Sequence, residues 1–321
     1  MNRKRIADAV APIIDVFLVG LVIPAAFLFR FVRHLGLSRL TLTRSVLMRI
    51  GILPVRNHYY EPFVTSKDLI CPLTRERELP GIDLNEQGQL DFLSTLHFEN
   101  ELSQLEKPAP DRHDFKFGND MFESGDAEFL YQVVRRIKPA RVFEIGSGYS
   151  TLVARASIKR NLAENAGLKC RHVCIEPYAA PWLESTGVEV LRERVEFVDR
   201  VLFRDLGEGD LLFIDSSHVI RPQGDVVTEY LEILPILRPG VIVHIHDVFT
   251  PRDYLEEWVI NSALLWNEQY LLEAFLCNNP DWTVIGALNF LKHRHFDALK
   301  KVCPYLSPDR EPGSFYIQKK C

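Results

Sequence analysis

The segment RVFEIGSGYSTL, residues 141–152, constrains the fold of this 321-residue chain more than any other stretch. The letters VFEI predict a short buried strand, GSG predicts a tight turn, and the residues after the turn have helical spacing. Glycines at such a turn let the backbone pass close to a ligand, and the N-terminus of the following helix offers free N–H groups. The segment therefore predicts an α/β fold with a ligand site at the glycine turn.

Regular alternation of strands and helices continues after this segment. Further strands are predicted at residues 172–176, 188–191, 210–215, 241–247, 282–286 and 314–317, and helices over 90–105, 126–137, 224–237 and 256–275. The carboxyl ends of parallel strands meet at one edge of a sheet. Four acidic residues are therefore expected together at that edge: Glu144, Glu176, Asp215 and Asp247.

Two details of the glycine turn indicate the kind of ligand. A dinucleotide fingerprint has a third glycine three residues after Gly148, where this chain has Thr151. In addition, the acidic Glu144 stands two residues before Gly146. Together with CIEP, LLFIDSSH and VIVHIHD, the segment EIGSGYSTL resembles the class I S-adenosylmethionine (SAM)-dependent methyltransferases of the family 24 branch, and the resemblance runs from about Phe117 to Ile317.

This resemblance implies a fold, an activity and a cofactor. The fold would be a Rossmann-like doubly wound seven-stranded α/β sheet, in which the last strand, at Ser314–Ile317, is antiparallel and lies between the fifth and sixth. The activity would be that of a class I methyltransferase, and the cofactor would be SAM. Glu176, at the tip of the second strand, would accept both ribose hydroxyls, which a carboxylate can do well. The residues assigned to the cofactor are Glu144, Gly146, Ser147, Gly148, Glu176 and Asp215.

Polar residues after the fourth and fifth strands are the catalytic candidates, namely His218, His246 and Asp215. An imidazole titrates near neutrality and can accept the proton of an acceptor hydroxyl. Metal-dependent O-methyltransferases, a subset of the enzymes that the chain resembles, have an acid after the fourth strand and an acid pair after the fifth, which implies Asp215 and Asp247 as metal ligands. His246 replaces one oxygen ligand of that pattern, which disfavours magnesium and favours a softer metal such as manganese, iron or zinc.

An apolar run extends from Ala9 to Phe29 and contains Asp15, Pro12 and Pro24. Three interpretations fit it. It is a single-pass membrane anchor with the catalytic body in the cytoplasm, as the arginines after the run favour. Alternatively it is a re-entrant or interfacial helix broken at Pro24, or an apolar helix buried in a partner or in the body. Cleavage as a secretory signal is not expected, because no small-residue site follows the run.

The charge of the chain is unevenly distributed. Residues 1–50 carry a net charge of +6, which leaves −11 for the rest of a chain whose total is −5. The acidic body argues against a nucleic-acid partner, and the basic, apolar N-terminus favours a membrane surface. The predicted organisation is a membrane-associated segment (1–50), a small helical cap and linker (51–116) and a SAM-binding methyltransferase domain (117–321).

Three functions are compatible with this pattern. The first is a membrane-associated SAM-dependent methyltransferase that modifies oxygen on a small-molecule, lipid or glycan acceptor. The second is a metal-dependent, hydroxylase-like enzyme on the same scaffold. The third is a non-catalytic, membrane-attached SAM-binding protein. The sequence names no acceptor and assigns no oligomeric state.

Overall fold

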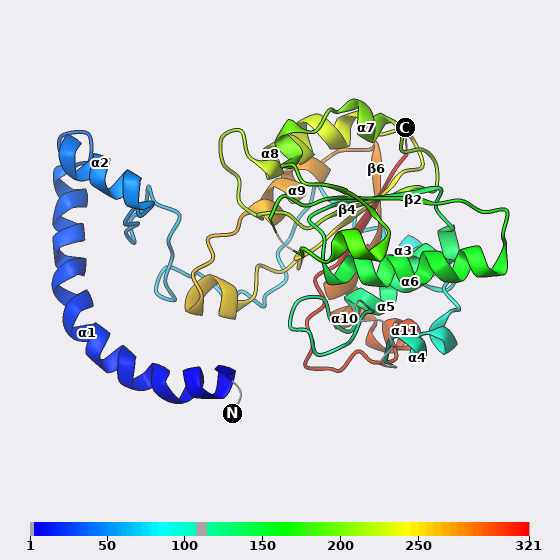
Figure 1. Ribbon diagram of the computed structural model, residues 1–321, viewed down its shortest axis with the longest axis horizontal. Helices are drawn as coiled ribbons and strands as arrows, with labels where there is room; N and C mark the ends of the chain where they lie inside the picture. Colours follow the sequence, from blue (N-terminus) through cyan, green and yellow to red (C-terminus); the bar gives the residue numbers. More distant parts are fainter. Residues whose placement is uncertain (1–2, 107–113, 179, 321) are drawn as a thin grey trace. The chain divides into compact units, whose positions relative to one another are not determined.

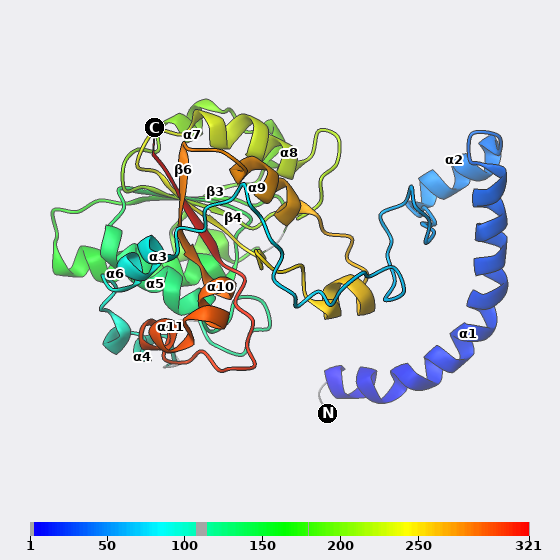
Figure 2. The ribbon, with the colours of Figure 1, turned by 180° about the vertical axis from the view of Figure 1, so that it is seen from behind.

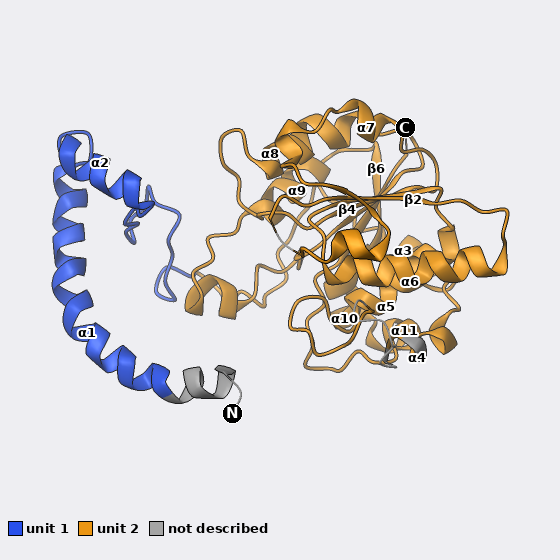
Figure 3. Cartoon of the chain, viewed as in Figure 1, with its two compact units in different colours: residues 1–69 blue, residues 70–321 orange. Residues whose placement is uncertain are grey.

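The computed structural model describes residues 3–106, 114–178 and 180–320, and it divides into two compact units, residues 1–69 and 70–321 (Figure 3). The contacts thus separate the chain after Leu69, whereas the sequence-based boundaries at 50 and 116 stay predictions.

The first unit is built around a long apolar helix, α1 (Arg3–Leu35), followed by α2 (Thr41–Ile50). The part of α1 from Val10 to Leu35 is long and apolar enough to cross a membrane, and its apolar window is not buried within the structure. The same length and composition also describe a signal sequence. The helix continues through Pro12 and Pro24 (Figure 1), so the predicted break at Pro24 does not occur.

The second unit contains one seven-stranded sheet with the order β3-β2-β1-β4-β5-β7-β6. The strands are β1 (Arg141–Ile145), β2 (Arg171–Ile175), β3 (Glu189–Leu191), β4 (Leu211–Ile214), β5 (Ile242–Ile245), β6 (Trp282–Ala287) and β7 (Phe315–Lys319). The pairs among the first five strands are parallel, and β7 pairs antiparallel with both β5 and β6. This topology confirms the predicted doubly wound sheet and the position of its last strand.

Helices cover both faces of the sheet. In both views, α3, α5, α6, α10 and α11 lie on one side of it and α7, α8 and α9 on the other (Figures 1 and 2). The helices of this unit are α3 (Glu86–Leu93), α4 (Ser103–Glu106), α5 (Asp126–Ile137), α6 (Tyr149–Glu164), α7 (Val201–Arg204), α8 (Asp225–Thr228), α9 (Glu268–Leu276), α10 (Leu288–Arg294) and α11 (Phe296–Val302). Because both faces are covered, the central strands are buried throughout and read as continuous apolar runs.

Three predicted helices are shorter or less regular than their periodicity indicated. The helix expected over 256–275 is a π-helical turn at Glu257–Asn261 followed by irregular chain, and α9 begins only at Glu268. The backbone amides of Asn267 and Glu268 donate to the carbonyl of His218, at 2.9 and 3.1 Å, and this contact with the loop after β4 takes the place of the helix.

Of the other two interruptions, one has a tertiary cause and one a local cause. In the segment 90–105, α3 ends at Leu93, and the amide of Phe98 donates instead to the side chain of Gln132 on α5 at 2.9 Å. The segment 224–237 begins as α8 and continues as a π turn at Glu229–Ile233 and a 3-10 turn that contains Pro235. Proline has no amide to donate, so it does not continue an α-helix.

Gly146 stands where a side chain has no room. Its φ is +77°, and a Cβ built on it would lie 1.8 Å from the carbonyl oxygen of Asp215. We expect Gly146→Ala to lower the free energy of unfolding by roughly 2–4 kcal/mol, from backbone strain and from separation of β1 and β4. Gly207→Ala is the matched control, because the nearest atom to its added Cβ is 4.0 Å away and its φ is not in the left-handed region. Thermal melting of the detergent-solubilised full chain would show this, and equal melting of the two variants would contradict it.

Candidate active site

Three of the predicted site positions stand side by side because the sheet hydrogen bonds continue one residue past each strand. The backbone amide of Gly146 donates to the last carbonyl of β2, that of Asp215 to the last carbonyl of β1, and that of His246 to the last carbonyl of β4, at 2.8–3.0 Å. Similarly, the amide of Glu176 donates to β3 at 3.1 Å. The sheet register therefore collects these residues at one edge, as expected from the sequence. Glu144 was expected there too, but it lies within β1 opposite Cys174 and is buried below the edge.

The glycine turn is shaped to receive a ligand. The backbone amide of Ser147 lies 3.2 Å from a carboxylate oxygen of Glu176, which joins the turn to the end of β2. The hydroxyl of Ser147 is buried and has no hydrogen-bond partner among the described residues. In front of Gly148 there is open space, and α6 begins at the next residue. An open turn and a helix N-terminus together form a cradle for a polar ligand.

Glu144 lies beneath the turn and is almost completely buried. Its carboxylate accepts hydrogen bonds from the hydroxyls of Ser150 and Thr151, at 3.0 and 2.9 Å, and contacts the ring of His172. The hydroxyl of Thr151 in turn accepts the amide of Gly148 at 3.2 Å. Thr151, the residue that departs from a dinucleotide fingerprint, thus braces the turn, and Glu144 holds Thr151 in place.

A second group of side chains gathers beside the turn, at the ends of β4 and β5. Nε2 of His218 lies 3.2 Å from Oδ1 of Asp215 and 3.5 Å from Oδ2 of Asp247. Nδ1 of His246 lies 3.6 Å from Oδ1 of Asp215 and 3.4 Å from Oδ1 of Asp247. We call these four residues the strand-end cluster. Both imidazoles are buried, whereas the Asp215 side chain is 33% exposed and open to a ligand.

Each imidazole of the strand-end cluster has a carboxylate behind it. Nδ1 of His218 lies 2.8 Å from Oε2 of Glu268, and its ring packs on Trp266 with ring centres 4.3 Å apart. Nε2 of His246 lies 3.9 Å from Oδ2 of Asp126, and its ring packs on Phe122. The contact with Glu268 orients the His218 ring, whereas Asp126 is too far from His246 for a hydrogen bond and acts on that ring through its charge.

The carboxylates around the imidazoles set the charge state of the cluster. Burial opposes protonation of both histidines, but Asp215 and Glu268 raise the pKa of His218, and Asp247 and Asp215 raise the pKa of His246, well above the usual value. Burial would raise the pKa of Asp215, but the two imidazoles hold it well below its usual range. Burial raises the pKa of Asp247. The cluster is therefore a place where positive charge is stabilised.

Sequence reasoning did not assign the residues behind the imidazoles to the cluster. Glu268 is 50 positions after His218, and Asp126 is 120 positions before His246, so no motif spacing connects them. Ser217, the residue before His218, is not part of the cluster, because its hydroxyl donates to Asp225 at 2.7 Å, at the start of α8. Ser217 therefore helps to begin a helix.

Part of the chain is similar in sequence to known proteins. Residues 143–248, from β1 to just past β5, match the model of a methyltransferase domain, family 24. An uncharacterized protein of Archaeoglobus fulgidus is 28% identical over 179 residues, which cover 51% of this chain and 78% of that protein. Residues 143–248 contain the glycine turn and all four residues of the strand-end cluster.

Removing the negative charge beneath the turn tests how the turn is held. Glu144→Gln replaces one buried acceptor oxygen by a donor, so we expect it to lower the free energy of unfolding by about 1–3 kcal/mol. Glu189→Gln is the control, because Glu189 forms an exposed ion pair with Arg171 that contributes about 0–1 kcal/mol. Thermal or urea denaturation measures both, and a Glu144→Gln variant as stable as the control would refute the bracing role.

Proposed function

Because this chain carries a class I SAM-dependent methyltransferase domain, we propose that it transfers the methyl group of SAM to an oxygen atom of a small-molecule, lipid or glycan acceptor. The observation that carries the proposal is the placement of an open glycine turn directly beside a polar, partly open cluster. The glycine turn would hold the methyl donor, and the strand-end cluster would hold the acceptor.

The cofactor would lie against the glycine turn. Gly146, Ser147 and Gly148 would approach SAM through their backbone, and the Glu176 carboxylate would accept hydrogen bonds from the ribose hydroxyls. Asp215 borders both the turn and the cluster. Glu144 would act indirectly, by bracing the turn.

Methyl transfer needs an acceptor oxygen that is aligned with the methyl group. It also needs a group that accepts the proton of that oxygen or stabilises the negative charge on it. Alignment alone supplies much of the acceleration of such a two-substrate reaction. We assign the acceptor side to His218, His246 and Asp215, which share one edge of the sheet. Because the pKa of both imidazoles is raised, they would be positively charged and would stabilise the negative charge that develops on the acceptor oxygen. Trp266, which packs on His218, would border the acceptor.

A divalent metal also fits the strand-end cluster. Asp215 and Asp247 offer carboxylate oxygens, and a ligand atom from each of Asp215, His246 and Asp247 lies within 4.8 Å of the others. Nδ1 of His246 is buried without a hydrogen-bond partner among the described residues, which is the feature a ligand atom would show. When bound, a metal supplies Lewis-acid activation of an acceptor oxygen. The same observation favours the second candidate function, a metal-dependent, hydroxylase-like enzyme.

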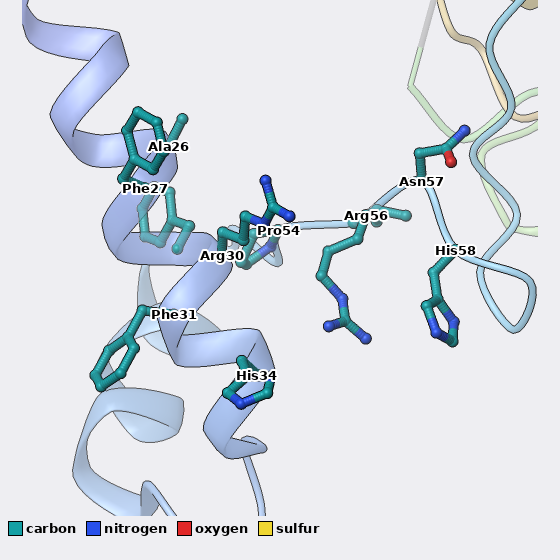
Figure 4. Close-up of a pocket in the computed structure, with 11 residues that line it drawn as sticks. Ala26, Phe27, Arg30, Phe31, His34, Pro54, Arg56, Asn57 and His58 are labelled. Carbon is teal, nitrogen blue, oxygen red and sulfur yellow. The ribbon is translucent and has the colours of Figure 1, made fainter. Parts of the chain in front are cut away.

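We also propose that the first unit attaches the enzyme to a membrane, with its catalytic domain in the cytoplasm. Basic and aromatic side chains from the end of α1 and from residues 54–58 line a hollow of about 800 Å³ (Figure 4). Arg30, His34, Arg56 and His58 contribute basic side chains, and Phe27 and Phe31 contribute apolar surface. Basic groups at the end of an apolar helix suit the anionic headgroups of the cytoplasmic leaflet.

Calorimetric titration of SAM into the detergent-solubilised full chain tests the cofactor. We expect binding in the micromolar range, weakened about 10- to 100-fold in Glu176→Gln, because the ribose loses hydrogen bonds to a charged acceptor. Glu189→Gln, which removes a carboxylate from the exposed start of β3, should bind as the wild type does. Absence of SAM binding in the wild type would refute the methyltransferase function. An unchanged affinity in Glu176→Gln would refute the assignment of that residue.

Resistance to extraction tests membrane attachment. The wild-type chain should stay with membranes after an alkaline carbonate wash, and Leu18→Arg with Val22→Arg should release it, because each arginine in the centre of a span costs about 2.5–3.5 kcal/mol. The control variant carries Phe197→Arg and Leu231→Arg, at exposed apolar positions of the second unit. Release of the wild type, or retention of the α1 variant, would contradict the anchor.

A further inference from the structure

Helix α2 carries a row of exposed apolar side chains along one face. Leu42, Val46 and Ile50 follow one another at intervals of four residues, so they lie on the same side of the helix. Their exposed fractions are 83%, 57% and 63%. We call these three residues the apolar row. Neighbouring apolar side chains that stay exposed together mark a surface that contacts a membrane or a partner.

Another face of α2 is directed at α1. Leu47, which stands about 100° round the helix from Val46, is buried, and so is Val32 near the end of α1. Both views show α2 beside the last turns of α1 (Figures 1 and 2). The helix ends at Gly51, whose φ is +81° and whose amide donates to the carbonyl of Leu47 at 2.9 Å. The helix is therefore held at the end of α1 with the apolar row uncovered.

The place of α2 beside α1 sets its level in a bilayer. The apolar run of α1 ends at Phe29, and Arg30 is the first basic residue after it. Val32 lies two residues further along, which is about 3 Å of helix rise. The headgroup layer on each side of the hydrocarbon core is roughly 5–8 Å deep. When α1 spans the core, a helix held beside Val32 therefore lies in the headgroup layer.

A pair of exposed tyrosines is tied to the same level. Glu61 pairs with Arg33 on α1, and Arg56 lies 3.7 Å from the same carboxylate oxygen. Tyr59 and Tyr60, just before Glu61, are 92% and 85% exposed, and their rings meet edge to face. Tyrosine is enriched at membrane–water interfaces, because its ring is apolar and its hydroxyl is polar. These residues thus indicate the same layer as the apolar row does.

The charge of this region fits an anionic bilayer. Between Asp15 and Glu61 the sequence has six arginines and no acidic residue. Three of them, Arg39, Arg44 and Arg49, stand on α2 or just before it and are exposed. A short amphipathic helix with arginines beside its apolar face is the kind that lies in the plane of a membrane interface. Anionic lipid attracts each such arginine, and this one-sided charge favours a lipid surface over a protein partner.

We propose that α2 lies in the headgroup layer of an anionic membrane, with the apolar row inserted toward the acyl chains and the arginines at the lipid phosphates. This contact is additional to the α1 span, and it rests on the proposed membrane attachment of the first unit. A spanning helix responds mainly to the thickness of the hydrocarbon core. The in-plane helix makes the attachment depend on headgroup charge as well.

The accessibility of α2 in a bilayer tests the proposal. Val46→Cys and Met48→Cys are each made in the full chain, which is placed at one chain per disc in nanodiscs that contain phosphatidylserine. A charged maleimide is added, and the modification of position 46 or 48 is read from the mass of its peptide. We expect position 46 to react at least about tenfold more slowly, because a charged reagent does not enter the acyl layer.

Met48 is the matched control position on the same helix. It is 52% exposed, against 57% for Val46, and it stands about 200° round the helix from Val46. Neither substitution changes a buried side chain, so both variants should fold. Equal reaction rates at the two positions would overturn the proposal. Protection that appears only with several chains per disc would identify an interface between copies, and would overturn it too.

The dependence on lipid charge is measured in the full chain with Leu18→Arg and Val22→Arg, whose α1 no longer spans. Sedimentation compares vesicles of phosphatidylcholine alone with vesicles that also contain phosphatidylserine. We expect at least about tenfold tighter binding to the anionic vesicles. Val46→Asn should weaken that binding about five- to tenfold, and Met48→Asn should leave it within about twofold. Equal binding to both kinds of vesicle, or equal effects of the two asparagines, would contradict the proposal.

The two membrane contacts can fail separately. Resistance to the carbonate wash reports on the α1 span, and the maleimide rates report on α2. A chain that resists the wash but reacts equally at positions 46 and 48 would keep the span and lose the in-plane helix. A chain that the wash releases, but whose position 46 becomes protected when anionic vesicles are added, would keep the in-plane helix and lose the span.

Discussion

The close approach of β1 to β4 is the constraint on which the site depends. At their carboxyl ends the chain passes so near the carbonyl of Asp215 that position 146 accepts only glycine. The same approach brings the glycine turn against the loop after β4, and hydrogen bonds that continue past the strand ends add the residues after β2 and β5. A ligand lying on the turn would therefore also lie beside the strand-end cluster.

Buried charge is the second organising feature of the molecule. Glu144 stands below the turn, and Asp126, Asp215, Asp247 and Glu268 surround two imidazoles beside it. Burial of so many carboxylates is costly unless cations or hydrogen-bond donors compensate them. Beneath the turn, hydroxyls and His172 meet this need. In the strand-end cluster the imidazoles compensate the charge of the carboxylates. Nδ1 of His246 forms no hydrogen bond with any described residue.

Much of the fold was predictable, because its signals are local. Apolar runs that end in acidic residues located the strands, and their order followed from the resemblance carried by EIGSGYSTL and VIVHIHD. Helical periodicity failed where tertiary contacts compete with it, as at Asn267 and Glu268, whose amides bond to the carbonyl of His218. The interruption after α3 has the same kind of cause, since Phe98 donates to Gln132.

By itself, the sequence determined which residues lie at the carboxyl edge of the sheet. The apolar pattern locates the end of each strand, and the ends of parallel strands share one edge. Glu176, Asp215, His246 and Asp247 were all found in this way. Only the tertiary structure decided which atoms of these residues face one another and which other side chains contact them. Asp126 and Glu268 reach the histidines from distant helices, and Ser217 turns away to α8. Side-chain direction depends on the packing of separate elements, which no local pattern in the chain specifies.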